Sequence, residues 1–342
     1  MKKLIKSPIL TDNHILNKYL ITYTEPDYRI KELNCTFLRY IIETKNKELI
    51  DYIFNDYYKP ETIINHKTYT IKELAISQGY FIDEFVKQDD SRIKYTIAYY
   101  NYKHDILYKD NSDWIRRQIA KMGNYLKELS DDPSSMVRYV VAEKGLYHEK
   151  FYKDEDPTIR QIVAKQGNFH ENLYKDIDYR VRKEVAKHGK YLDKLVNDKD
   201  SRVRLEIVKH GKHNNKLIND KSYKIRLEIA NQGQHLDTLS KDKNPKVRLA
   251  VISYIVKNKN KFKESDIKKY TDILYKDDNK AVRASVAHLG YHLDTLHKDN
   301  DWFVRIAVAR QGKYLDILKN DKDINVRYIA QSIISDEAML LN

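Results

Sequence analysis

The arrangement of apolar and polar residues repeats along most of the chain with a fixed period. Within residues 198–211, Val203, Ile207 and Val208 are apolar at helical spacing, and charged residues fill many of the other positions. Asp198 and Asp200 stand at the start of this segment and Gly211 at its end, and these are typical helix start and stop signals. The pattern returns 22 residues later. We therefore predict one helix per period, followed by a second, shorter helix such as 191–195 that is α-helical or 3₁₀.

An arginine that follows Val or Ile marks each period, and we call it the anchor arginine. Anchors are 22 residues apart from Arg116 to Arg248, and the next one comes 35 residues later. Lys72 and Lys94 continue the phase backwards, and Arg39 marks one more unit before an insertion near 57–67. The anchors are Arg116, Arg138, Arg160, Arg182, Arg204, Arg226, Arg248, Arg283, Arg305 and Arg327. This self-similarity gives about thirteen units and predicts an all-α fold, an α-solenoid of stacked two-helix repeats.

Helix ends are predicted from glycine and proline. A glycine comes seven residues after most anchors, where a left-handed cap is expected. After Arg248 this glycine is replaced by Ile255, so we expect a longer helix there, an insertion at 255–270 and a longer second helix around 266–274. Pro133 and Pro157 each follow an aspartate, and we place both in the first turn of a helix, where proline costs no hydrogen bond.

Composition limits the classes of protein and of site. The chain has 342 residues, 9 glycines and one cysteine, Cys35, which excludes an intramolecular disulfide and a zinc or iron–sulfur site built on cysteines. No apolar run approaches the roughly 18 residues that span a bilayer, and the N-terminus lacks the apolar core of a signal peptide. We expect a cytoplasmic protein without metal or cofactor. Residues 1–30 are predicted as an N-terminal capping segment and 31–342 as the solenoid.

The repeat pattern resembles known helical repeat families. Asp-x-x-x-x-Val-Arg-x-x-Val-Ala, as at residues 176–186, followed by a Leu-rich second helix, is similar to HEAT-like repeats and especially to the variant leucine-rich repeat. The resemblance covers roughly residues 30–340 and implies a superhelix with a concave face that binds protein or nucleic acid. The period here is shorter, and glycine stands where the variant repeat has Asn-Pro. The iron–sulfur segment of that family has no counterpart, since Cys35 is the only cysteine.

An aspartate stands six residues before each anchor arginine. One such pair per unit is typical of a structural ladder, in which a loop carboxylate binds a guanidinium group of its own repeat or of the next. A catalytic pair would occur once. The pairs are Asp110/Arg116, Asp132/Arg138, Asp154/Arg160, Asp176/Arg182, Asp198/Arg204, Asp220/Arg226, Asp242/Arg248, Asp277/Arg283, Asp299/Arg305 and Asp321/Arg327.

A basic stripe is the first candidate binding surface. Positions −2, +1, +5 and +8 from the anchor share one helical face, and residues 180–232 carry 15 Lys and Arg against 7 Asp and Glu. Two interpretations are open: contact with a phosphate backbone or an acidic protein, or a solvated face held by pairs such as Arg180 with Glu184. The stripe consists of Arg180, Lys183, Lys187, Lys190, Arg202, Lys209, Lys212, Lys224 and Lys246.

Aromatic and histidine side chains nine residues after the anchor form a second candidate surface. They could line a ridge that stacks on bases or on partner side chains, or pack against a neighbouring repeat with their polar tips in water. These residues are Tyr125, Tyr147, Phe169, Tyr191, His213, His235, His292 and Tyr314.

No motif in the sequence indicates a catalytic reaction. We find no phosphate-binding glycine loop, nucleophile elbow or His-Glu-x-x-His segment. The main hypothesis is a non-catalytic scaffold that binds a macromolecule, which we expect to be a protein, on the surface of the array. The alternative is sequence-tolerant nucleic-acid binding through the basic stripe. An enzyme like the DNA glycosylases that use HEAT-like repeats is a third hypothesis, which rests on fold analogy alone.

Overall fold

The computed structural model describes residues 62–340, apart from 65–66, 70 and 78. The expected capping segment (1–30), the unit around Arg39, and Cys35 lie outside the described residues, as does much of the predicted insertion at 57–67. The chain divides into two compact units, which we call unit 1 (Met1–Tyr147) and unit 2 (His148–Asn342). The repeat pattern is present in both.

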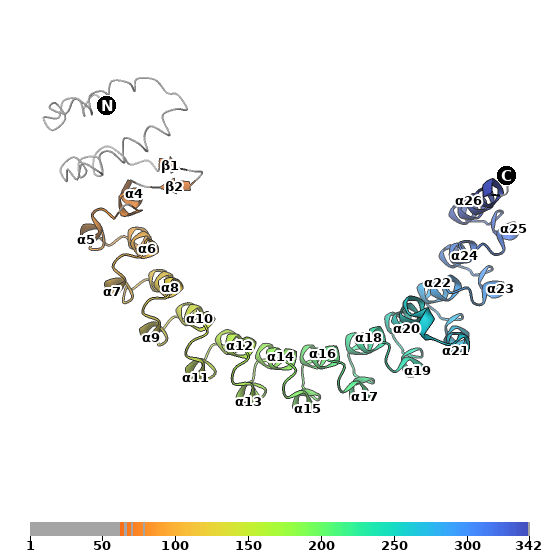
Figure 1. Cartoon of the computed structure of the whole chain (residues 1–342), viewed down its shortest axis with the longest axis horizontal. Helices are drawn as coiled ribbons and strands as arrows, with labels where there is room; N and C mark the ends of the chain where they lie inside the picture. Colours follow the sequence, from red (N-terminus) through yellow and green to blue (C-terminus); the bar gives the residue numbers. More distant parts are fainter. Residues whose placement is uncertain (1–61, 65–66, 70, 78, 341–342) are drawn as a thin grey trace, which may run out of the picture. The chain divides into compact units, whose positions relative to one another are not determined.

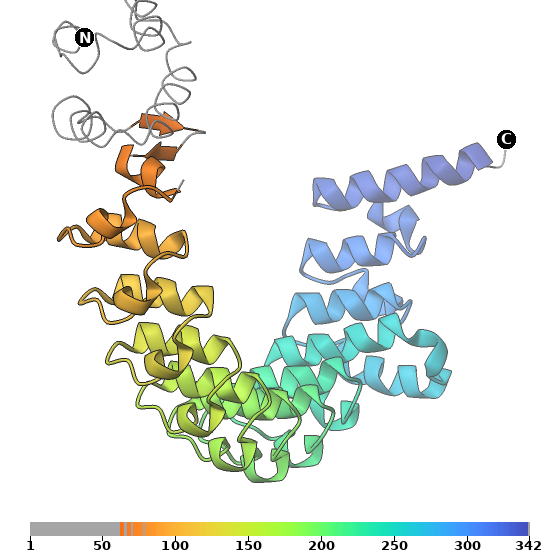
Figure 2. The same cartoon turned by 60° about the vertical axis from the view of Figure 1, so that its left-hand side comes forward.

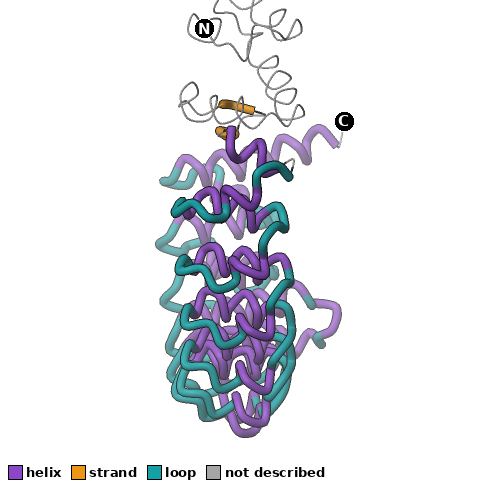
Figure 3. The backbone as a smooth tube through the Cα atoms, turned by 90° about the vertical axis from the view of Figure 1, so that its left-hand side faces the viewer, coloured by secondary structure: helices purple, strands orange, loops and turns teal. Residues whose placement is uncertain are grey.

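Unit 1 contains a small hairpin and then alternating longer and shorter helices (Figure 1). Strands β1 and β2 pair antiparallel, with Ile63 opposite Thr68; this hairpin, orange in Figure 3, was not predicted. From α4 onward, each longer helix packs on the next one. The elements are β1 (Thr62–Ile64), β2 (Lys67–Tyr69), α4 (Ile71–Ser77), α5 (Ile82–Phe85), α6 (Ser91–Tyr99), α7 (His104–Leu107), α8 (Asp113–Met122), α9 (Leu126–Leu129) and α10 (Ser135–Glu143).

Unit 2 continues the alternation in two layers. The long helices α12, α14, α16, α18, α20, α22, α24 and α26 lie side by side, and the short helices all lie on one side of them (Figures 1 and 2). The elements are α11 (His148–Phe151), α12 (Pro157–Lys165), α13 (His170–Leu173), α14 (Tyr179–Lys187), α15 (Leu192–Leu195), α16 (Ser201–Lys209), α17 (Asn214–Leu217), α18 (Tyr223–Asn231), α19 (Leu236–Leu239), α20 (Pro245–Lys257), η2 (Lys259–Lys261), α21 (Glu264–Leu274), α22 (Lys280–His288), α23 (Leu293–Leu296), α24 (Trp302–Ala309), α25 (Leu315–Leu318) and α26 (Ile324–Leu340).

Helix α14 shows why each 22-residue repeat forms a helix. The Asp178 carboxylate accepts from the backbone N–H of Arg180 at 2.7 Å and caps the first turn. Val181 and Val185 are fully buried, and burying a valine side chain contributes about 1.5 kcal/mol or more. Gly189 follows with a φ of 71°, which ends the helix as predicted. The apolar side faces the short helices and the neighbouring units, so the core is a continuous layer.

The exceptions to the pattern behave mostly as expected. Helix α20 runs on to Lys257, since Ile255 replaces the glycine that stops other long helices, and α21 is correspondingly long. Pro157 is in the first turn of α12. The prediction for Pro133 is wrong, because Ser134 is the N-cap of α10 and the proline precedes it. The short helices are single α-helical turns such as α15, so the α-helical alternative holds there. The predicted all-α solenoid is confirmed.

Candidate functional site

Most anchor arginines connect their own repeat to the next one, as Arg204 shows. Arg204 Nε and Nη2 donate to the Asp220 carboxylate at 2.6 and 2.9 Å, while Nη1 donates to the Asp198 backbone carbonyl at 2.5 Å. The Asp220 carboxylate also accepts from the Ser222 N–H at 2.8 Å. An aspartate thus gives its carbonyl to the arginine six residues later and its carboxylate to the arginine sixteen residues earlier. We call this arrangement the Arg–Asp link.

The Arg–Asp link recurs along both units. It is a two-pronged guanidinium–carboxylate contact between largely buried side chains, which is the stronger kind of ion pair. The further links are Arg116–Asp132, Arg160–Asp176, Arg182–Asp198, Arg226–Asp242, Arg248–Asp277, Arg283–Asp299 and Arg305–Asp321. Arg138 and Arg327 donate to the carbonyls of Asp132 and Asp321 in the same way. The link of Arg248 differs in one respect, because its guanidinium also contacts the Asp278 carboxylate.

The electrostatics of the link keep both partners charged. Burial raises the pKa of Asp220, but the hydrogen bonds from Arg204 and from the Ser222 N–H outweigh it, so the pKa lies below its usual value. The hydrogen bond to Asp220 raises the pKa of Arg204. A carboxylate that stays ionised and bonded on several sides has no capacity left for proton transfer at neutral pH. The geometry is that of a structural connection.

The candidate aromatic column lies at the start of the short helices. Its members have positive φ values, 53° at Phe169 and 54° at Tyr191, and they precede the first helical residue. Phe169 stacks on Tyr152 of the preceding unit with ring centroids 4.4 Å apart, and Tyr191 stacks on Tyr174 at 4.7 Å. The same contact is made by Tyr125 with Tyr108, His292 with Tyr275 and Tyr314 with His297. These stacked pairs join successive repeats, and each ring of a pair covers one face of the other.

Among the described residues, His213 and His235 make no stacked contact of this kind. His213 instead contacts the Asp193 carboxylate at 3.1 Å, with its side chain 16% exposed. His235 is partly buried with a φ of 53°, and Tyr147 is 36% exposed. The column therefore does not form one uninterrupted stacking surface.

The stripe residues at positions −2, +1 and +5 lie on the long helices, on the side that faces away from the short helices. We call this side, made of positions −2, +1 and +5, the exposed face. In unit 2 the row of long helices bends with this face on its inner side (Figure 1). The prediction that position +8 shares this helical face is wrong, because Gly189 and Gly211 end the helices before Lys190 and Lys212.

Many cations of the stripe have acidic partners on the same surface. Arg180 pairs with Asp178 at 2.8 Å, and this hydrogen bond lowers the pKa of Asp178. Lys183 and Lys209 both approach Glu206, at 3.6 and 3.1 Å. In the same way Arg202 pairs with Asp200, and Lys187 lies 3.7 Å from Glu184. The stripe is therefore a mixed surface of both signs.

Arg202 also lies over an aromatic ring, as does Lys246, and the three remaining stripe cations are exposed. The Arg202 guanidinium is 3.4 Å from the centroid of the Tyr179 ring, and Lys246 Nζ is 5.7 Å from that of Tyr223. Lys190, Lys212 and Lys224 are exposed.

An apolar column runs through the same face. Position +1 is Leu205 in α16, Leu227 in α18 and Leu249 in α20, and all three leucines are partly exposed. The column continues with Ala284 in α22 and Ile306 in α24, which are 6% and 8% exposed. Because the long helices pack in sequence order, these positions form a row across the face.

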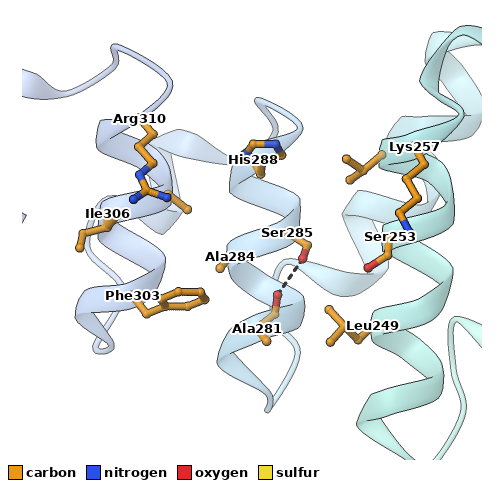
Figure 4. Close-up of a pocket in the computed structure, with 12 residues that line it drawn as sticks. Leu249, Ser253, Lys257, Ala281, Ala284, Ser285, His288, Phe303, Ile306 and Arg310 are labelled. Atoms are coloured by element: carbon orange, nitrogen blue, oxygen red, sulfur yellow. Dashed lines mark hydrogen bonds between the residues drawn. The ribbon is translucent and has the colours of Figure 1, made fainter. Parts of the chain in front are cut away.

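A hollow of about 340 Å³ interrupts the row over α22, and we call it the α22 groove. Its floor is made of the small residues Ala281, Ala284 and Ser285, and its walls come from α20 and α24, including Leu249 and Phe303 (Figure 4). The residues at its other end are Lys257, His288 and Arg310, one from each helix. Sequence reasoning missed this groove, although the small residues at face positions of one unit between bulkier neighbours could have indicated it.

Comparison with known proteins assigns no family: no protein-family model matches the chain, and neither does any curated protein sequence. In the part of the chain that the structure describes, no three His, Cys, Asp or Glu side chains are placed to hold a metal ion together. Across the same residues, no helix combines the length and the apolar character that crossing a membrane requires. The exposed face of unit 2 carries the apolar column and the α22 groove, and we take it as the candidate site.

Proposed function

We propose that the chain is a non-catalytic scaffold that holds a protein partner on the exposed face of unit 2. The supporting observation is the apolar column of Leu205, Leu227 and Leu249, which continues to the α22 groove. An extended apolar row bordered by charged positions is typical of a protein interaction surface. Successive long helices pack about 8–10 Å apart, so the row can contact a partner over several units.

The mixed charge of the face favours a protein over a nucleic acid. Glu184 and Glu206 are largely buried beside the stripe lysines, and Asp178 and Asp200 bind the arginines at its edge. A phosphate backbone approaching these lysines would meet the carboxylates too, and like charges repel it. Leucines at the centre of the face contribute nothing to phosphate contacts but do contribute to a protein interface.

The proposal is tested by capturing partners from the host cells with purified chain, with and without nuclease. Leu227→Glu places a charge in the apolar column, and Thr238→Glu places the same charge on exposed α19 in the short-helix layer as a matched control. We expect a protein that resists nuclease treatment and is lost with Leu227→Glu but retained with Thr238→Glu. Recovery of nucleic acid alone would contradict the proposal.

A salt titration separates the nucleic-acid alternative. A labelled duplex is titrated with the chain at several salt concentrations, because the logarithm of the binding constant falls by about 0.9 per phosphate contacted for each tenfold rise in salt. We expect no measurable duplex binding at low salt. Binding with a steep salt slope that Lys190, Lys212 and Lys224 substitutions reduce would support the alternative instead.

A further inference from the structure

The α22 groove has the dimensions of a seat for one helix. It runs along α22, which has nine residues and is therefore about 14 Å long, between the neighbouring helices α20 and α24. The groove exists because Ala281 and Ala284 occupy positions where the next unit has Phe303 and Ile306. A helix laid along α22 would thus contact three helices at once, as amphipathic helices do in apolar grooves.

An extended segment fits this groove less well than a helix does. A strand needs partners for its N–H and C=O groups, and the groove is lined mainly by apolar atoms. Ser285 lines the floor, but its hydroxyl already donates to the Ala281 carbonyl at 2.9 Å. A helix satisfies its own backbone and presents only side chains.

The charge at the end of the groove specifies the partner further. Lys257, His288 and Arg310 lie together at the C-terminal ends of their helices, while Leu249, Ala281 and Phe303 lie at the opposite end (Figure 4). No acidic residue is among the groove's lining residues. The chain as a whole carries a net charge of +13, which attracts acidic partners from a distance.

We propose that the α22 groove binds an amphipathic helix of the partner protein, with apolar side chains over Ala281 and Ala284 and carboxylates at the end near Lys257 and Arg310. Carboxylates are most stable in the first turn of a helix, so this helix runs antiparallel to α22. Its N-terminus then faces the C-terminal ends of α20, α22 and α24, and the helix dipoles are favourably opposed. This inference rests on the proposed function and names the class of segment that is recognised.

A displayed library of random helical peptides provides the test. It is selected on the wild-type chain, after removal of binders to a variant carrying Ala281→Phe and Ala284→Leu. These substitutions fill the groove with the side-chain types found at the same positions of neighbouring units, Phe303 and Leu249, so the fold should be retained; urea midpoints check this. We expect enriched peptides with apolar residues at helical spacing and Asp or Glu in the first turn. No enrichment, or sequences without acidic residues, would overturn the inference.

Affinities of the best selected peptide then locate its site by fluorescence anisotropy. Ala284→Leu and Arg310→Glu should each weaken binding by about tenfold or more, as substitutions at the centre of an interface do. Lys165→Glu is the matched control, because Lys165 is exposed at the same repeat position in α12; it should change the affinity by less than about twofold. Equal losses for Lys165→Glu and Arg310→Glu would refute a specific charge contact.

The same peptide distinguishes the inference from the proposed function. A peptide that binds wild-type chain but is lost with Leu227→Glu and unaffected by Ala284→Leu would refute the groove and leave the exposed face as an interface. If host-cell capture also yields no protein, both are refuted.

Discussion

Replacing Arg204 with alanine would remove one complete Arg–Asp link between α16 and α18. The Asp220 side chain, only 6% exposed, would keep its charge with the Ser222 N–H as its remaining hydrogen bond, and the Asp198 carbonyl would lose its partner. Removing one partner of a buried ion pair costs about 3–5 kcal/mol, since the other charge stays buried. We expect a loss of unfolding free energy in this range.

Arg202→Ala is the matched control, because it makes the same change in the same helix. Arg202 also pairs with an aspartate, Asp200, but the two side chains are 57% and 19% exposed. Exposed pairs contribute about 0–1 kcal/mol. Arg204→Lys should be intermediate, since an ammonium group keeps the charge without the two-pronged contact.

The assay combines urea unfolding, followed by circular dichroism, with amide hydrogen exchange. Repeat arrays open locally, so exchange shows where protection is lost. For Arg204→Ala we expect a lower urea midpoint and faster exchange concentrated in residues 201–231. A change below about 0.5 kcal/mol, as for a surface substitution, or equal losses for Arg202→Ala, would refute the structural role of the link.

Three further predictions follow from the contacts between units. The pKa of Asp220 in the folded chain lies below the value of about 3.9 in unfolded chains. The stability that its link contributes is therefore present above about pH 5 and is lost as pH falls through the folded pKa. Urea midpoints that stay level down to about pH 3 would contradict this. Gly233→Ala should destabilise the chain more than Gly211→Ala does, by about 1–3 kcal/mol, because an added Cβ would collide with the Tyr254 ring at the first site and meet nothing within 4 Å at the second. Equal thermal midpoints would rule this out. Tyr191→Gly should be more stable than Tyr191→Ala by about 1 kcal/mol. Both variants lose the stacked ring, but only glycine adopts the positive φ at this position without a steric cost. Urea midpoints in the opposite order would show that no strain is stored there.

Much of the fold could be predicted from the sequence because the same helix signals recur in successive repeats. The glycines that end helices and the spacing of apolar residues predicted the helices, and Ile255 in place of a glycine predicted the longer α20. Periodicity could not determine which aspartate binds Arg204. In a 22-residue repeat, a constant spacing of six to Asp198 implies an equally constant spacing of sixteen to Asp220, so the two pairings look alike until the units are stacked.

Less of the candidate site could be predicted. The aromatic column was visible, but the positive φ of Tyr191 was not, because aromatic residues carry no preference for that conformation. Helical spacing alone placed Lys190 and Lys212 on the stripe although their helices end before them, and the pairing of Lys183 with Glu206 depends on contact between repeats. The α22 groove arises because Ala281 and Ala284 have small side chains, and small residues do not form a motif that stands out in a sequence.

Site-specific photo-crosslinking tests most directly the claim that the exposed face binds the partner. A benzophenone side chain is placed at Leu205 on this face and, separately, at Lys216, which is exposed on α17 in the short-helix layer. After irradiation in host cells, adducts are identified by mass spectrometry. We expect a protein adduct from position 205 and none from position 216. Adducts from position 216 alone would contradict this claim.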